Sequence, residues 1–299
     1  GQALRAYMGR LVLGVDTTSP QSIWCSQTIA PGLEQILFNT GEYFPVNGRL
    51  PRPPTDVTAI GLAAVGERGR ELQGPLVVTT LSRTYLLSGD FLDDPNATFI
   101  QVSARAGCIG SKACTETPYG FFYIGTDTVW CIPSGGGVPI DVGWPIRPAI
   151  KDIPVGSRSK CLALYHKGFL KLSIVPTGSS TAINGWWMDL RQGITPIPSW
   201  WGPHVQAPPS CQATSQVETA EPDRGWQAVD GPNGNWLEIL HQPGIYLENN
   251  EVTTIQSILI TGELNAGRPF DRKLWKRIRA VGLTGTDTTV EISGSVDGG

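Results

Sequence analysis

Short apolar runs separated by turn residues recur along the chain. In YGFFYIGTDTVWCIP, residues 119–133, the runs FFYI and VWCI flank the polar step Gly125-Thr126-Asp127-Thr128. β-Branched and aromatic runs bounded by such residues are typical of a β-hairpin. The sequence therefore predicts two antiparallel strands in this segment.

The two halves of this hairpin recur in other parts of the chain. The first half is a glycine followed by an apolar strand, and it occurs at 9–15, 74–80, 120–126, 168–175 and 234–240. The second half is a strand centred on an aromatic residue, and it occurs at 22–26, 84–88, 128–132, 185–190 and 244–248. We expect the aromatic residues of these five copies to occupy equivalent, largely buried positions: Trp24, Tyr85, Trp130, Trp187 and Tyr246.

The spacing of these copies predicts the fold class. Successive marker glycines are 65, 46, 48 and 66 residues apart, and the shorter intervals match the period of ~40–50 residues of four-stranded propeller blades. The longer intervals require an insertion or an additional blade, and 56–65 is a candidate additional strand. A hairpin cannot bury both faces alone, so the units must stack, and a closed ring leaves only short edges.

We therefore expect an all-β fold, a β-propeller of roughly five to seven antiparallel blades with an inserted or flanking β-segment. The alternatives are a sandwich and a solenoid. The propeller should occupy 1–299 as part of a longer chain, with the last blade and an accessory β-segment at about 250–299.

Composition supports this fold class. Gly and Pro total 36 + 24 = 60 of 299 residues, against an average nearer ~12%. Because both residues disfavour helix interiors, we expect helix below about 10%. One segment, 270–281, has a helical apolar pattern, and we assign it to a strand because its surroundings are all-β.

Charge limits the classes of partner. Charged residues make up only 16% of the chain, below the ~25% typical of soluble domains, which indicates that much surface is covered by other subunits. The net charge of −3 provides no global basic field for nucleic acid. No apolar run approaches the ~20 residues of a membrane span.

Candidate catalytic and metal-binding residues are few. The six cysteines form no CxxC pair, and we expect buried free thiols. His166, His204 and His241 lie near turns and outside nucleophile motifs, so we expect no catalytic residue, metal or cofactor. AEPDRGW at 220–226 weakly resembles the Asp-box turn of sialidases, which leaves a glycosidase based on Glu221 and Asp223 as an alternative.

Ten tryptophans include the adjacent pairs Trp186-Trp187 and Trp200-Trp201. Neighbours in a strand point to opposite faces, so one member of each pair should enter the core and the other face outward. The outward members indicate either a stacking platform for a glycan or packing against a blade or subunit. We favour packing because aromatic residues dominate interface cores.

Basic residues are concentrated near the C-terminal end. Six positive charges lie within twelve residues: Arg268, Arg272, Lys273, Lys276, Arg277 and Arg279. This cluster could protect a strand edge, contact acidic residues of another subunit, or face DNA. We favour the subunit contact, because neutralising phosphates with six cations would hold DNA too tightly for transit.

Four segments in order resemble β-propeller proteins of bacteriophage tails: YMGRLVLGVDTTSPQSIWCSQ, GPLVVTTLSRTYLLSGD, SARAGCIGSKACTETPYGFFYIGTDTVWCI and NGWWMDLRQGITPIPSWW. The likeness runs from about residue 7 to 202 and continues more faintly to the end, although the blade spacing here is irregular.

The resemblance implies a structural virion protein, the hub or nozzle of a short-tailed phage. Copies of such a subunit form a ring below the portal and adaptor, contact the adaptor and the fibre or tip proteins, and surround the DNA exit channel without sequence-specific binding. It implies assembly in the host cytoplasm, no membrane span and no enzymatic activity. The alternatives are a carbohydrate-binding or glycan-cleaving propeller for receptor recognition, and a cellular interaction platform, although WD and kelch motifs are missing.

Overall fold

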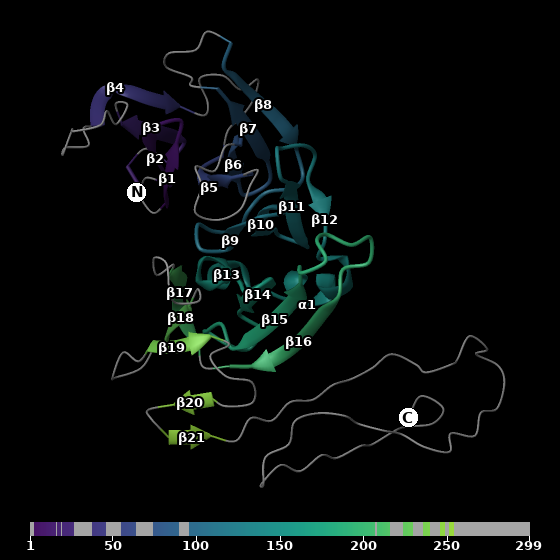
Figure 1. The fold of residues 1–299 in the computed structure, drawn as a ribbon. Helices are drawn as coiled ribbons and strands as arrows, with labels where there is room; N and C mark the ends of the chain where they lie inside the picture. The colour runs from purple at the N-terminus through teal and green to yellow at the C-terminus, as the bar shows by residue number, and fades with distance from the viewer. Residues whose placement is uncertain are drawn as a thin grey trace, which may run out of the picture. The chain divides into compact units, whose positions relative to one another are not determined.

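The computed structural model divides the chain into two compact units, 1–241 and 242–299 (Figure 1). It describes residues 3–15, 17–18, 20–26, 38–45, 55–63, 74–89, 96–206, 208–215, 224–229, 236–239, 246–248 and 251–253. Within these ranges the second unit contains one hairpin, β20 (Tyr246–Glu248) and β21 (Glu251–Thr253).

The first unit consists of successive antiparallel sheets, each made from strands consecutive in sequence. The first sheet contains β1 (Ala3–Tyr7), β2 (Arg10–Gly14), β3 (Ser22–Ser26) and β4 (Phe38–Pro45). The second contains β5 (Val57–Leu62), β6 (Leu76–Thr80), β7 (Thr84–Ser88) and β8 (Thr98–Ser103). The third contains β9 (Cys114–Thr117), β10 (Gly120–Ile124), β11 (Val129–Pro133) and β12 (Ile140–Asp141).

The fourth sheet contains β13 (Leu162–His166), β14 (Phe169–Ile174), β15 (Asn184–Asp189) and β16 (Trp200–Val205). In the fifth, the described strands are β17 (Pro209–Ser215), β18 (Arg224–Val229) and β19 (Trp236–Ile239). The first strand of each sheet contacts the first strand of the next, from β1 through β5, β9 and β13 to β17. In Figure 1 the later strands of each sheet extend away from these first strands. The predicted all-β class is confirmed at the level of antiparallel sheets.

Two groups of buried side chains form the core of the first unit. The smaller lies between the first two sheets and includes Tyr7, Ile23, Ile60 and Tyr85. The larger runs from the second sheet to the fourth and includes Val77, Phe121, Phe122, Leu170 and Met188. The first four sheets are therefore apolar on faces that they turn towards one another, as four-stranded units that must stack require.

The helical segments of the described residues are three short pieces between the third and fourth sheets. They are η2 (Trp144–Ile146), α1 (Arg147–Lys151) and η3 (Val155–Lys160). Pro145 and Pro148 are the second residues of η2 and of α1, in the first turn, where the missing N–H costs no helical hydrogen bond. No helix within the described ranges has the length and apolar character needed to cross a bilayer.

The predicted repeat is confirmed for its first four copies. The strand after the marker glycine is the second strand of its sheet (β2, β6, β10 and β14), and the aromatic strand is the third (β3, β7, β11 and β15). The predicted hairpin at 119–133 is β10 and β11, closed by Gly125 N donating to Thr128 O at 2.8 Å. Segment 56–65 supplies β5, the first strand of the second sheet.

The prediction for the fifth copy is wrong, because its segments lie one strand later than the equivalent segments of the other copies. Segment 234–240 supplies β19, the third strand of its sheet, and 244–248 supplies β20, in the second unit. The second-strand place belongs to β18, where Gly225 pairs with Thr214 and with Ile239 inside the ladder. A glycine before an apolar run marks any strand, so it could not distinguish β18 from β19.

The prediction that the aromatic residues of the copies occupy equivalent strand positions is also wrong. Trp24 pairs with Leu13 and Tyr85 with Val78, and both partners lie four residues after the marker glycine of their copy. Trp130 pairs with Tyr123, which lies only three residues after its marker glycine. Trp187 likewise pairs with Lys171, three residues after Gly168. A shift of one residue turns a side chain to the other face. Tyr85 is fully buried, but Trp24, Trp130 and Trp187 are only partly buried.

The predictions for 270–281 and for the side chain of Tyr246 lie outside the described residues, as does the predicted last blade and accessory β-segment at about 250–299 apart from 251–253.

Candidate interaction surface on the fourth sheet

Alternation along β14 gives the fourth sheet two different faces. Leu170, Leu172 and Ile174 belong to the large core cluster. Phe169, Lys171 and Ser173 lie on the opposite face, where Lys171 and Ser173 bond to side chains of β17 and β18. The second face therefore turns towards the fifth sheet.

The tryptophan pairs divide between these faces as predicted. Trp186 and Trp200 pack against the core cluster, and Trp200 Nε1 donates to Val142 O at 2.7 Å. Trp187 and Trp201 are partners in the β15–β16 register and lie on the other face, where Trp201 is 38% exposed.

Phe169 joins these outer tryptophans in an aromatic cluster. Its ring centroid lies 6.4 Å from that of Trp187, edge to face, and 6.3 Å from that of Trp201. Such separations allow favourable quadrupole contacts between the rings. We call Phe169, Trp187 and Trp201 the aromatic cluster.

Two cations border the aromatic cluster. Arg191 Cζ lies 4.8 Å from the Phe169 centroid, and Lys171 Nζ lies 5.5 Å from the Trp187 centroid, within the range of cation–π attraction. Arg191 also binds Asp189, with Nη2 at 2.7 Å from Oδ2 and Nε at 3.0 Å from Oδ1. Hydrogen bonds from the Arg191 side chain lower the pKa of Asp189. This exposed pair adds little stability, but it fixes a planar polar group beside the aromatic rings.

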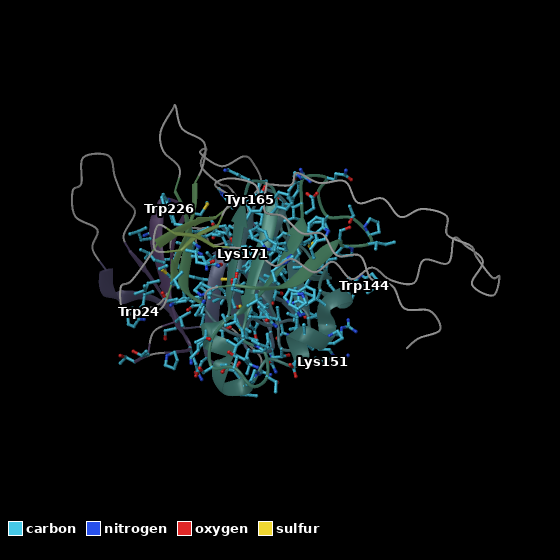
Figure 2. All side chains as sticks on the ribbon, turned by 90° about the horizontal axis from the view of Figure 1, so that it is seen from below. Trp24, Trp144, Lys151, Tyr165, Lys171 and Trp226 are labelled. Atoms are coloured by element: carbon cyan, nitrogen blue, oxygen red, sulfur yellow. The ribbon has the colours of Figure 1, made fainter. Side chains whose placement is uncertain are left out.

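Lys171, labelled in Figure 2, belongs to a buried polar network between the fourth and fifth sheets. Its Nζ donates to Gln227 Oε1, which also accepts from Gln212 Nε2 at 3.0 Å. Gln212 Nε2 lies 2.9 Å from Ser173 Oγ. Burial lowers the pKa of Lys171 to about 7. A neutral amine is a nucleophile, but Lys171 is only 5% exposed beneath Gln227 and Trp187, so we assign it to packing.

This network was missed in the sequence, although a signal was present. Three residues after the marker glycine, the other copies have Val12, Val77 and Tyr123, whereas the fourth has Lys171. A lysine at a strand position that is otherwise apolar indicates a buried polar contact, because such a group requires a partner.

The other candidates from the sequence do not join this surface in the described residues. His166 is 1% exposed at the end of β13, and His204 is partly exposed on β16. The basic cluster Arg268–Arg279, His241, Glu221 and Asp223 lie outside the described residues. The remainder of the Asp-box-like segment, 224–226, begins strand β18.

The predicted free thiols are confirmed where the structure describes them. Cys108, Cys114, Cys131 and Cys161 are buried and unbridged, and Cys211 is partly exposed. Burial raises the pKa of Cys108, of Cys131 and, to about 11, of Cys161. Among the described residues no three His, Cys, Asp or Glu side chains are grouped as metal ligands.

No protein-family model matches the sequence, and no curated protein matches it significantly.

Proposed function

We propose that this chain is a structural virion protein of a bacteriophage tail, a propeller-bearing subunit of a hub or nozzle ring around the DNA exit channel. The proposal combines the ordered sequence resemblance with the arrangement of the sheets. It assigns no catalytic role to any residue.

One contact carries the propeller part of the proposal. Glu116 of β9, in the third sheet, accepts from Arg5 Nε of β1 at 2.6 Å and from Leu62 N of β5 at 3.0 Å. First strands of three successive sheets thus meet at one carboxylate. Sheets stacked face to face are about 10 Å apart, so the first and third would be about 20 Å apart in a layered stack, too far for a single ion pair. Sheets that converge at their first strands fit a propeller instead.

A second contact repeats this geometry further along the chain. Lys112, which precedes β9 in the third sheet, donates from Nζ to Ser210 O of β17 at 3.1 Å, and its own carbonyl accepts from Ala163 N of β13 at 2.9 Å. The third, fourth and fifth sheets therefore also meet near their first strands. This convergence favours a propeller over a sandwich or solenoid.

Assembly into a ring is supported by the surface. The described residues expose large apolar side chains, including Trp144 at 49%, Val155 at 74% and Val205 at 86%. We infer that other subunits cover some of these side chains, since exposed apolar patches mark sites of protein–protein contact. We place the basic cluster at such a contact, with acidic partners on a neighbouring copy or on the adaptor, fibre or tip proteins.

Electron microscopy and light scattering of the purified chain test the proposal. We expect rings with a central channel and a mass that is a multiple of 32.2 kDa. The double variant Lys273→Glu, Lys276→Glu should form fewer rings without loss of β-structure by circular dichroism. Lys151→Glu, on the exposed end of α1 (Figure 2), is the control. A chain that stays monomeric at all concentrations would contradict the proposal.

The aromatic cluster supports a second candidate, a carbohydrate-binding propeller. The exposed ring of Trp201, near a fixed carboxylate–guanidinium pair, can stack on a sugar ring, and the pair can bond the sugar hydroxyls. Binding of the monomer to a glycan array, lost in Trp201→Ala and retained in Trp144→Ala, would favour this candidate. Release of sugar that is lost in Glu221→Gln or Asp223→Asn would favour a glycosidase.

A further inference from the structure

A cavity of about 210 Å³ lies where the third, fourth and fifth sheets meet. Lys112 reaches it from the segment before β9, and Ser159 and Lys160 from the end of η3. Thr181 and Ala182 come from the β14–β15 connection, and Pro209 and Ser210 from the start of β17. Four separate segments of chain therefore contribute to one small site.

The lining of this cavity has a single sign of charge. It contains two lysines and three hydroxyl side chains, and no carboxylate. In the described part of the chain neither lysine forms an ion pair. In a protein of net charge −3 this is a local concentration of positive charge with nothing in the lining to neutralise it.

Both lysines are exposed residues at the cavity, and each makes one hydrogen bond and keeps free donors. Lys112 Nζ donates to Ser210 O at 3.1 Å, and Lys160 Nζ donates to Ser180 O at 2.8 Å. An ammonium group has three N–H donors, so each lysine has two more for a ligand. The hydroxyls of Ser159 and Thr181 can rotate to donate as well.

The volume limits the size of the ligand. Sites for drug-sized molecules begin at about 300 Å³, whereas one water takes up about 30 Å³ of liquid. The site is open to solvent on one side, and its 210 Å³ suits a small anion with a few waters. Tetrahedral oxyanions offer several acceptors to donors that converge from different directions, and phosphate is a common partner of lysine.

We propose that this cavity binds a small oxyanion of the phosphate class through Lys112 and Lys160. The bound anion links the third, fourth and fifth sheets and neutralises the positive charge between them. This proposal is independent of the tail-protein function, because it rests on the cavity alone.

Thermal unfolding in phosphate and in chloride at equal ionic strength tests the site. A ligand of the native state raises the Tm as its concentration increases, so we expect a higher Tm in phosphate for the wild type. We expect the double variant Lys112→Met, Lys160→Met to lose this difference and Lys151→Met to keep it. Equal Tm values in the two salts for the wild type, or an unchanged phosphate effect in the double variant, would overturn the proposal.

A direct measurement covers the case in which the double variant does not fold. Phosphorus NMR should show broadening of the inorganic phosphate signal by the wild type. Lys160→Gln should weaken binding by about tenfold, the value of one charge-assisted hydrogen bond, and Ser159→Asp should abolish it by repulsion. Unchanged broadening in both variants would overturn the site.

Competition identifies the source of the phosphate. A short DNA duplex that displaces inorganic phosphate from the wild type would assign the site to backbone phosphates. Displacement by a sugar phosphate but not by the duplex would assign it to small soluble ligands. Either result supports an oxyanion site.

Discussion

Phe121 of β10 occupies the space that a side chain on Gly61 of β5 would require. A Cβ atom at residue 61 would lie 2.1 Å from Phe121 Cε2. Phe121 is fully buried in the larger core cluster, so its ring has little freedom to move. The second and third sheets can approach closely only because residue 61 has no side chain.

Gly61→Ala should therefore destabilise the protein by about 1–3 kcal/mol, the usual cost of overpacking a core. Chemical denaturation measures the difference. Gly156→Ala is the matched control, because a Cβ there meets nothing within 4 Å. Equal stability of the two variants would contradict the close packing of β5 on β10.

Lys171→Met should stabilise the protein at pH 7, because a methionine has no charge to desolvate; buried ion pairs replaced by apolar residues gain roughly 1–4 kcal/mol. Gln227 Oε1 keeps its bond from Gln212 at 3.0 Å, so the variant leaves that acceptor satisfied. Lys151→Met, at an exposed position, should change stability little.

The advantage of Lys171→Met should depend on pH. Burial lowers the pKa of Lys171 from 10.5 to about 7, so between these values the unfolded chain holds a proton that the folded chain lacks. The free energy of unfolding of the wild type therefore decreases as the pH falls from 10.5 towards 7, and the cost of burying Lys171 disappears above 10.5. The stability gained by Lys171→Met over the wild type should shrink as the pH rises from 7. If urea denaturation shows the same difference in the free energy of unfolding at every pH, the lowered pKa of Lys171 is contradicted.

Tyr123 and Thr84 should couple across the second and third sheets. Thr84 Oγ1 donates to Ala106 O, so the Tyr123 hydroxyl, 2.9 Å away, donates to Thr84. Tyr123→Phe should cost about 1 kcal/mol, and Thr84→Val about 1–3 kcal/mol because it leaves a buried hydroxyl unpaired. A double-mutant cycle should give a coupling of at least about 0.5 kcal/mol, and additive effects would argue against the bond.

Cysteine alkylation should be selective in the folded protein. The thiolate is the reactive form, and burial raises the pKa of Cys108 and of Cys131. Iodoacetamide followed by mass spectrometry should show Cys211 modified first, and Cys108 and Cys131 only after unfolding. Modification of Cys131 as fast as Cys211 would show that the third sheet opens readily.

Local signals in the sequence predicted much of the sheet structure. Gly, Thr and Asp between apolar runs located the β10–β11 hairpin, because turn chemistry is encoded within a few residues. Alternation in β15 and β16 correctly separated Trp186 from Trp187 and Trp200 from Trp201. These features depend only on neighbours along the strand.

Features that depend on pairing between distant segments were not predictable in this way. The register that sets Trp187 opposite Lys171 rather than Leu172 is decided by packing across β14 and β15. The cavity at Lys112 and Lys160 combines four segments, and the Arg5–Glu116 bond joins residues 111 positions apart. No pattern within one strand indicates which segments will meet.

Because each sheet of the first unit is made of strands consecutive in sequence, most backbone pairing joins segments that leave the ribosome close together in time. Contacts at short sequence separation form quickly, since little chain entropy is lost in closing them. The first sheet can pair before β5 has been synthesised, and each later sheet finds a partner face already present. Synthesis of the chain from its N-terminus thus follows the order in which its sheets can be stabilised.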